Sequence, residues 1–317
     1  MSAGAITSVS VAWASPFDPV SPQAAAIRDL FERTLLLCGA ILLLVVCLVA
    51  YCVVRFRAGK GREAVQFEGS TRLETAWTIA PILILGGLLT FTAQAMDAAD
   101  PPIDREPDVT IIGHQWWWEA KYPSGVVTAN EIHIPTGKAL VFRLEASDVI
   151  HDFWVPELGR KMDATPGESR SIWLEADRPG SYAGACAEYC GAQHAWMRIL
   201  VIADTPERFA EWQHHQLTPA PPPVEAATAR GAATFDRMTC ASCHVIVGKA
   251  GNGRFAPDLT HLASRTTLGA GVLANTPAAL GSSLHNPQEI KPGCHMPNAQ
   301  LTDTQVADLV AYFETLQ

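Results

Sequence analysis

The chain contains 317 residues and has a formal net charge of −9, and 48% of its residues are hydrophobic. The length suggests about two domains, and the acidic balance argues against nucleic acid as a partner. It is compatible with a basic protein partner. The apolar residues are clumped in particular stretches rather than spread along the chain.

The start of the sequence leaves open whether a signal peptide is removed. Residues 1–22 are rich in small side chains, and an Ala-Trp-Ala-Ser step ending at Ser15 could serve as a signal-peptidase site. The stretch lacks the basic beginning and the strong apolar core of a secretory signal. We predict a tail outside the membrane over residues 1–29, with cleavage undecided.

Two uncharged apolar runs follow, over residues 34–54 and 75–96. Each has about 21 or 22 residues, which is long enough to cross a hydrocarbon core of about 30 Å. Pro81 lies near the start of the second run, where a missing N–H matters least. We predict a transmembrane helix hairpin over residues 30–98. A pair of buried core helices is the alternative.

The connection between the two runs is basic. Positively charged loops stay in the cytoplasm, so this connection is expected inside. Both termini and everything after Met96 are then on the periplasmic side of a bacterial inner membrane. The basic residues are Arg55, Arg57, Lys60, Arg62 and Arg72.

Short segments with the composition of β-strands begin near Asp108. They are separated by Gly, Pro and Asp turns, and several short strands within about 110 residues indicate a β-sandwich. A short helix is expected from Pro206 to Trp212. The expected strands lie within residues 109–112, 138–144, 169–174 and 197–202.

A Pro-rich stretch, residues 217–225, follows this helix. Tandem prolines favour an extended chain, so we predict a semi-rigid linker there. The linker divides the part outside the membrane into two predicted domains, over residues 105–216 and 226–317.

Residues 186–197 combine two cysteines, a histidine and a methionine, and a further histidine lies upstream. Thiolate, imidazole and thioether form the soft ligand set that selects copper. A blue-copper site uses one cysteine, so the pair suggests two copper ions bridged by both sulfurs. A disulfide or a zinc site is the alternative, but zinc sites favour C-x2-C pairs and rarely use methionine. The candidate ligands are His151, Cys186, Cys190, His194 and Met197.

The last predicted domain carries Cys240-Ala-Ser-Cys243-His244, which has the spacing of a c-type haem attachment motif. The two thiols would bond to the haem vinyl carbons, and His244 would be the proximal iron ligand. The alternative is a redox C-x2-C pair with an incidental histidine. The surroundings favour haem, because helix-like stretches flank the motif, the second over residues 302–316.

This region resembles a small class I cytochrome c over its whole length. The resemblance implies that Met296 is the distal iron ligand, which raises the redox potential relative to a second histidine. His295 adjoins it and is its competitor. The resemblance also implies that Pro257 is the haem-side proline and that Arg265 contacts a propionate.

The chain as a whole resembles subunit II of cytochrome c oxidase, of the kind with a fused C-terminal cytochrome c. The resemblance covers about residues 30–317 and rests on the copper loop, on residues 151–163 and on the aromatic segment 113–119. It implies that the sandwich is a cupredoxin Greek key. The expected fold class is therefore a multidomain membrane protein with a transmembrane hairpin, a cupredoxin-like sandwich and an all-α cytochrome c domain.

The same resemblance divides the copper ligands between two ions. One copper takes His151 and Met197, the other takes His194 and the backbone carbonyl of Glu188, and both cysteines bridge the pair. The Glu188 carboxylate, with Asp163, would hold a magnesium ion at the interface with subunit I, since magnesium prefers hard oxygen ligands. A carboxylate that faces solvent is the alternative for Glu188.

The resemblance also implies that Trp116 is the residue at which electrons enter the copper centre. A core aromatic of the strand is the alternative, because large aromatic residues are usually well buried. The haem domain is expected to dock over Trp116. Tethering gives an effective concentration on the order of millimolar, so this docking is expected to be weak and mobile.

The implied function is electron relay from a donor to haem c, to the binuclear copper centre (CuA) and to subunit I. There oxygen becomes water, coupled to proton pumping. The implied partners are subunit I and other oxidase subunits, a soluble or membrane cytochrome c or a bc-type complex as donor, and membrane lipid. No nucleic acid is expected.

Three other functions share parts of this pattern. A nitric oxide reductase with a similar copper subunit would share every motif, and only its catalytic subunit would distinguish it. A quinol oxidase subunit II that has lost its copper is disfavoured, because the ligands are intact. A free-standing electron carrier is disfavoured by the two membrane spans. Cys294 is left without an assigned role.

Overall fold

The computed structural model describes residues 15–57, 68–100, 105–249, 253 and 255–317. Contacts divide the chain into two compact units, one over residues 22–101 and one that contains the rest. The question of signal-peptide cleavage falls on residues 1–14, outside the described residues. The predicted loop residues Lys60 and Arg62 also lie outside them.

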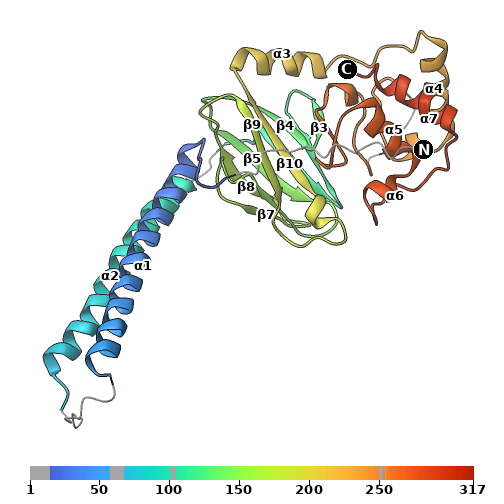
Figure 1. Ribbon diagram of the computed structural model, residues 1–317. Coiled ribbons are helices and arrows are strands. Elements are labelled where there is room, and N and C mark those ends of the chain that lie inside the picture. The colour runs from blue at the N-terminus through green and yellow to red at the C-terminus, as the bar shows by residue number, and fades with distance from the viewer. Residues whose placement is uncertain (1–14, 58–67, 101–104, 250–252, 254) are drawn as a thin grey trace. The chain divides into compact units, whose positions relative to one another are not determined.

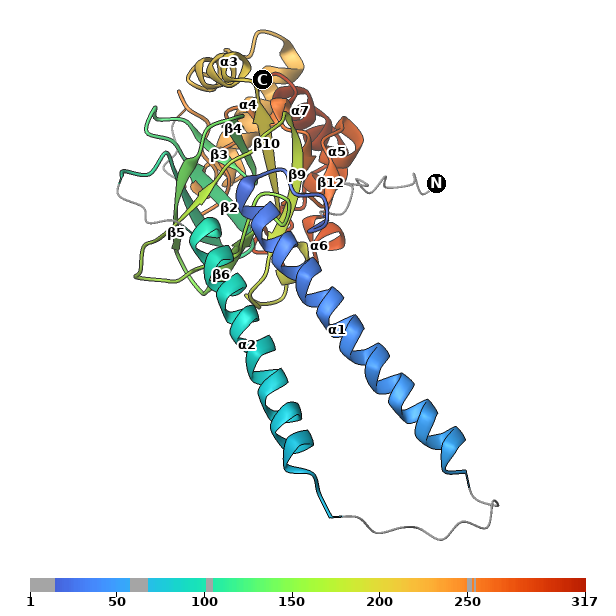
Figure 2. The same ribbon diagram turned by 90° about the vertical axis from the view of Figure 1, so that its left-hand side faces the viewer.

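The first unit is a pair of long helices, α1 (Pro22–Arg55) and α2 (Thr71–Ala99), which diverge toward the C-terminal end of α1 (Figures 1 and 2). Both are long and apolar enough to cross a membrane. Large hydrophobic side chains along both helices are exposed, as expected of surfaces covered by lipid. The predicted hairpin is confirmed. Both helices extend beyond the apolar runs, so Pro81 lies inside α2 rather than in its first turn.

The second unit contains a sandwich of two five-stranded sheets. The strand orders are β3-β2-β1-β5-β8 and β4-β10-β9-β6-β7. Most neighbours are antiparallel, but β1 pairs in parallel with β5 and β4 with β10. Parallel neighbours need crossover connections, which distinguishes this Greek-key sandwich from a simple meander. The strands are β1 (Val109–His114), β2 (Trp117–Lys121), β3 (Val127–Ala129), β4 (Glu131–Pro135), β5 (Leu140–Ala146), β6 (His151–Trp154), β7 (Met162–Ala164), β8 (Arg170–Leu174), β9 (Gly180–Cys186) and β10 (Arg198–Asp204).

The core of the sandwich lies between the sheets, where alternate side chains of each strand point inward. Trp118 and Phe153 are fully buried there and meet edge to face, with ring centroids 5.5 Å apart. Phe142 packs against Phe153 at 6.0 Å. This aromatic cluster lies next to the end of β6, so it supports the element that carries His151.

The four expected strands are observed, but their ends differ from the prediction by one or two residues. The strand predicted within residues 138–144 begins only at Leu140, because Gly137, with φ +68°, still belongs to the preceding turn. The last strand begins at Arg198 rather than Met197, because Met197 caps a 3-10 turn, η1 (His194–Trp196).

Residues 15–21 pack on the sandwich. Val20 is 2% exposed, its N–H donates to the Glu157 carbonyl at 2.8 Å, and its own carbonyl accepts from the Asp177 N–H at 2.8 Å. Helix α1 begins directly afterwards, at Pro22. The segment predicted as an outer tail over residues 1–29 is therefore divided between the two units.

The described residues of the C-terminal domain, from Ala226 on, are helical apart from one hairpin of two-residue strands. Helix α4 crosses α7 at Gly231, where an added Cβ would lie 2.0 Å from the Asp308 carbonyl oxygen. Only glycine allows this approach. A capping box at Thr302 and Gln305 begins α7. The elements are α4 (Ala226–Arg237), η2 (Cys240–Ser242), η3 (Leu262–Ser264), β11 (Thr267–Leu268), β12 (Leu273–Ala274), α5 (Pro277–His285), α6 (Pro287–Ile290) and α7 (Asp303–Phe313), preceded by α3 (Pro206–Gln216), which ends later than the predicted Trp212.

Candidate copper and haem sites

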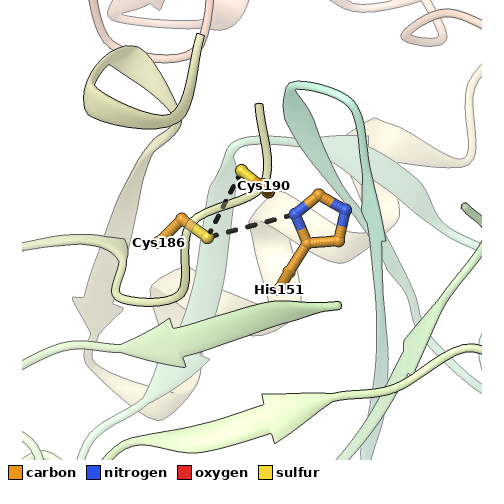
Figure 3. A group of neighbouring side chains, drawn as sticks. All are labelled: His151, Cys186 and Cys190. Atoms are coloured by element: carbon orange, nitrogen blue, oxygen red, sulfur yellow. Dashed lines mark hydrogen bonds between the residues drawn. The ribbon is translucent and has the colours of Figure 1, made fainter. Parts of the chain in front are cut away.

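The copper-ligand candidates come from the ends of two strands, β6 and β9, and from the loop between β9 and β10. His151 opens β6, and Cys186 closes β9. The Cys186 N–H donates to the Met197 carbonyl at 2.9 Å, which closes the loop and brings its two ends together. Figure 3 shows the His151 ring pointing toward the sulfur atoms of Cys186 and Cys190.

All six predicted copper-ligand atoms lie within one cluster. The two cysteine sulfurs are 3.8 Å apart. Around the Cys186 sulfur lie the His151 Nδ1 at 3.9 Å and the Glu188 carbonyl oxygen at 3.2 Å. The Cys190 sulfur lies 3.6 Å from the His194 Nδ1 and 3.8 Å from the Met197 sulfur. Two thiolates, two imidazoles, a thioether and a carbonyl fit a pair of soft metal ions such as copper.

The orientation of His151 is fixed from its far side. Its Nε2 lies 2.8 Å from the Asp148 carboxylate, so Nδ1 faces the sulfurs. Asp148 is itself held by the backbone N–H of Gln115 at 2.6 Å. An added Cβ at Gly113 would lie 2.7 Å from the His151 Cδ2, so only glycine leaves room for the ring. Sequence reasoning missed both residues. The Gly113 contact joins positions far apart in the chain, whereas Asp148 lies only three residues before His151 and was overlooked although it is a nearby carboxylate.

The electrostatics of the cluster favour a thiolate. The hydrogen bond from Cys190 lowers the pKa of Cys186, and burial opposes this effect. The hydrogen bond to Cys186, together with burial, raises the pKa of Cys190. Burial lowers the pKa of His151, but its bonds to Cys186 and Asp148 outweigh burial and raise the pKa overall. Metal ions bind the deprotonated groups, so copper would displace the protons that the cluster shares.

The haem motif begins directly after α4, on the turn η2. The His244 N–H donates to the Cys240 carbonyl at 2.9 Å, which places the histidine one turn after the first thiol. The His244 Nδ1 lies 2.8 Å from the Pro257 carbonyl. A proton on Nδ1 leaves Nε2 as the free ligand for iron. The residues therefore fit a covalently attached haem.

Met296 and His295 lie in the segment between α6 and α7, and their side chains have different surroundings. Met296 is 39% exposed, and its backbone carbonyl accepts from the Gln288 side chain at 2.8 Å. The His295 ring instead meets Trp116, with centroids 4.8 Å apart. Cys294 lies beside them, with its sulfur 3.3 Å from the Gln288 Nε2.

Arg265, the predicted propionate contact, is held by the protein. Its guanidinium donates to the Asp258 carbonyl, next to Pro257. Burial lowers the pKa of Arg265, and the negative charges of Glu131 and Asp258 oppose that effect. The propionate contact stays a prediction.

The three tryptophans of the aromatic segment have three different surroundings. Trp118 is the core aromatic. Trp117 stacks on His114 at a centroid distance of 4.2 Å. Trp116 is half-buried, and its Nε1 donates to the Cys190 carbonyl at 2.9 Å. The predicted electron-input residue therefore touches the copper loop directly.

The predicted magnesium ligands are only partly gathered. Glu188 is exposed, and Asp163 faces the buried Asp152 across the β6–β7 pair. One Asp152 carboxylate oxygen is buried without a hydrogen-bond partner among the described residues. Burial and the neighbouring Asp163 raise the pKa of Asp152 to about 7. The Asp152 carbonyl accepts from the Ala187 N–H at 3.0 Å, which brings this acidic pair beside the loop that carries Glu188.

A membrane anchor, a sandwich with copper-ligand candidates and a domain with a haem motif together define the class of oxidase electron-transfer subunits. Three family matches divide the chain in the same way. Residues 11–92 match the transmembrane domain of cytochrome C oxidase subunit II, residues 124–204 match its periplasmic domain, and residues 228–317 match cytochrome c.

Known relatives resemble the chain over most of its length. The cytochrome c oxidase subunit 2 of Alkalihalophilus pseudofirmus is 32% identical over 95% of this chain and 90% of its own. That of Bacillus subtilis is 30% identical over 84% and 82%. The crystal structure of the periplasmic domain of subunit II of cytochrome oxidase from Bradyrhizobium japonicum, 30% identical, covers 36% of this chain and 96% of that chain, with a TM-score of 0.34.

The chain belongs to the cytochrome c oxidase subunit II family. It is a membrane protein with a periplasmic domain, and it carries a fused cytochrome c domain. Membership implies a CuA copper centre, haem c, assembly with subunit I and a cytochrome c donor. The predicted fold class and the role of an oxidase subunit through which electrons enter are confirmed.

Proposed function

We propose that this chain passes electrons from a basic cytochrome c donor to haem c, then to CuA and on to subunit I. There oxygen is reduced to water, coupled to proton pumping. Haem c and CuA, when bound, each accept and release single electrons. Residues of the chain hold the two centres and provide a short path between them.

The main support for electron transfer from haem c to CuA is the position of Trp116 between the two sites. Its indole nitrogen donates to the carbonyl of Cys190, a copper-ligand candidate, and its ring meets His295, which adjoins the haem-ligand candidate Met296. The path from Met296 to Cys190 therefore needs only two intervening side chains. Trp116 is proposed to be the residue through which electrons enter the copper centre.

Replacing Trp116 tests this role. Trp116→Ala should slow flash-induced haem-to-copper transfer without changing the optical spectra of either centre, and Trp116→Phe should slow it less. Trp173→Phe, on β8, is the matched control and should transfer at the wild-type rate. Unchanged transfer in Trp116→Ala would reject the role.

The acceptor is tested on the complex. We propose that the chain co-purifies with a subunit I that holds two a-type haems and one further copper. Pyridine haemochrome analysis of the native complex should then give a-type and c-type haem. A partner subunit that reduces nitric oxide and lacks a-type haem would instead identify the chain as a nitric oxide reductase subunit.

A magnesium ion is proposed at the interface with subunit I, held by the Glu188 and Asp163 carboxylates. The proposal is supported by the unpartnered buried oxygen of Asp152 opposite Asp163. Magnesium prefers such hard oxygen ligands and keeps several waters. The Glu188 carbonyl faces the Cys186 sulfur at 3.2 Å, so the two groups of one residue serve different metals.

Both termini and both metal domains are proposed on the periplasmic side. This sidedness is supported by Arg55, Arg57 and Arg72, which flank the connection between α1 and α2, because basic connections stay in the cytoplasm. Protease added to intact spheroplasts should cut the linker at residues 217–225. Protection of the linker until the membrane is broken would contradict it.

A further inference from the structure

The carboxylate of Glu131 is buried in the contact between the sandwich and the haem domain. Glu131 begins β4 and is only 3% exposed. A buried carboxylate is costly unless hydrogen bonds compensate for its lost hydration. All of the bonds described for this side chain come from two residues of the haem domain, Thr266 and Thr267.

The two threonines donate four groups to this one carboxylate. The Thr266 N–H donates at 3.0 Å and its hydroxyl at 2.8 Å. The Thr267 N–H and hydroxyl both donate at 2.7 Å. Hydrogen bonds to a charged acceptor are stronger than neutral ones, and several converging donors define one orientation of the two partners.

The same threonines begin the β11–β12 hairpin, whose tip also lies against the sandwich. Ala270 at the tip forms a small buried cluster with Trp117 and Ala129. The Arg198 N–H donates to the Ala270 carbonyl at 3.3 Å. Gly271 has φ +79°, which favours glycine, and an added Cβ there would lie 3.1 Å from the Arg198 Cβ, in tight contact.

The hairpin is also joined to the segment that leads to Met296. The buried Lys291 Nζ donates to the Gly269 carbonyl at 2.9 Å and lies 3.5 Å from the Trp196 carbonyl of the copper loop. The next residue, Pro292, accepts a hydrogen bond from Gln193, also in the copper loop. The hairpin and the haem-ligand segment therefore form one continuous contact surface against the sandwich.

We propose that Glu131 and the β11–β12 hairpin form a built docking site that holds the chain's own haem domain on the copper domain in one pose. Glu131 is a positioning residue in this site. The weak, mobile docking expected from a linker alone is replaced by a specific buried contact. The consequence for electron transfer rests on the proposed function, whereas the docking itself does not.

A graded pair of variants of the full chain, loaded with haem and copper, tests the docking. Glu131→Gln keeps an acceptor oxygen but loses the charge, and Glu131→Ala loses both. Amide hydrogen exchange at Thr266 and Thr267 should become faster in Glu131→Ala, by about tenfold or more, with Glu131→Gln in between. Glu207→Ala, an exposed carboxylate on α3, is the matched control and should exchange as wild type does.

Thr267→Val tests the same contact from the side of the haem domain. It should speed exchange of the Thr266 amide in the wild-type background and add little in Glu131→Ala, because both changes break the same contact. Unchanged exchange in Glu131→Ala, or additive effects of the two changes, would overturn the docking site. An unchanged haem spectrum and protected amides in the sandwich core would show that each variant is folded.

Electron transfer is measured on the same samples. We expect flash-induced haem-to-copper transfer to slow by about tenfold in Glu131→Ala, as the docked fraction falls. Faster exchange with an unchanged transfer rate would leave the docking standing and reject the relay through the docked pose. Slower transfer with unchanged exchange would show that Glu131 acts without docking, and would overturn the inference.

Discussion

The rings of Trp116 and His295 lie with their centroids 4.8 Å apart and their planes inclined by 51°. One residue belongs to the turn between β1 and β2 of the copper sandwich, and the other adjoins the haem-ligand candidate Met296. The two domains therefore meet beside the copper loop, which Trp116 contacts at Cys190, and beside the haem-ligand candidate Met296, which adjoins His295. This contact makes both the ligand assignments and the electron path open to experiment.

The copper site depends on a glycine that is not a ligand. Gly113→Ala would place a Cβ 2.7 Å from the His151 ring, so the ring must move and the copper content should fall. The measurement is copper per protein together with the electron paramagnetic resonance signal of the pair. Cys186→Ser, which removes a bridging thiolate, is the reference for full loss.

Gly281→Ala is the control for the Gly113 change, because its nearest side-chain atoms lie 3.7 Å away, in ordinary contact. It should keep the wild-type copper content. Retention of a native copper signal in Gly113→Ala would show that His151 tolerates displacement, and the account of its orientation would fail.

The haem iron is predicted to have Met296 as its sixth ligand. The oxidised protein should show a methionine–iron charge-transfer band in the red that disappears in Met296→Ala. His295→Ala should keep the band, because that ring contacts Trp116. A wild-type spectrum without the band, together with a spectral change in His295→Ala, would identify two histidine ligands.

The two groups of Glu188 can be separated by one substitution. Glu188→Gln keeps the backbone carbonyl, so copper should stay and its spectrum should shift only slightly. Manganese substituted for magnesium in the assembled complex should be lost, and Glu168→Gln, an exposed carboxylate on the same sandwich, should keep it. Wild-type manganese binding in Glu188→Gln would reject the interface role, and loss of copper would show that its side chain serves the copper pair.

Burial of Lys291 predicts a pH dependence of stability. Burial lowers its pKa from 10.5 to about 8, so between these values the unfolded chain binds more protons than the folded one. The free energy of unfolding should therefore rise as the pH rises from about 8 to about 10.5, by at most about 3 kcal/mol. The thermal midpoint of the haem domain, followed by its Soret absorbance, measures the effect.

Lys291→Met should flatten this rise, because the titrating group is removed. Lys138→Met, an exposed lysine of the sandwich, should leave the rise as in wild type. An equal rise with pH in Lys291→Met would assign the effect to other groups.

Much of the architecture follows from local patterns in the sequence. Uncharged runs predicted the two long helices, and the soft ligands of residues 186–197 predicted the cluster of sulfur and imidazole groups around Cys186 and Cys190. The haem ligands stay a prediction. These patterns work because the ligands are near one another in the chain or belong to a fixed spacing. The ends of β5 and β10 were missed by one or two residues, because turn geometry at Gly137 and Met197 sets them.

The residues that position the sites were not predictable in the same way. Gly113 lies against His151 only once β1 and β6 are assembled, whereas Asp148 is a local partner, three residues before His151. Glu131 has an ordinary place in a strand, and its four donors come from a hairpin more than a hundred positions later. Nothing in the local sequence indicates such a contact, because it is created by tertiary packing.

The most direct test of the relay is flash reduction of haem c in the full chain, with the haem and copper absorbance followed together. The account predicts that haem oxidation and copper reduction occur in step, with one first-order rate that does not change with protein concentration. Transfer whose rate rises with protein concentration, or haem that stays reduced beside oxidised copper, would contradict it.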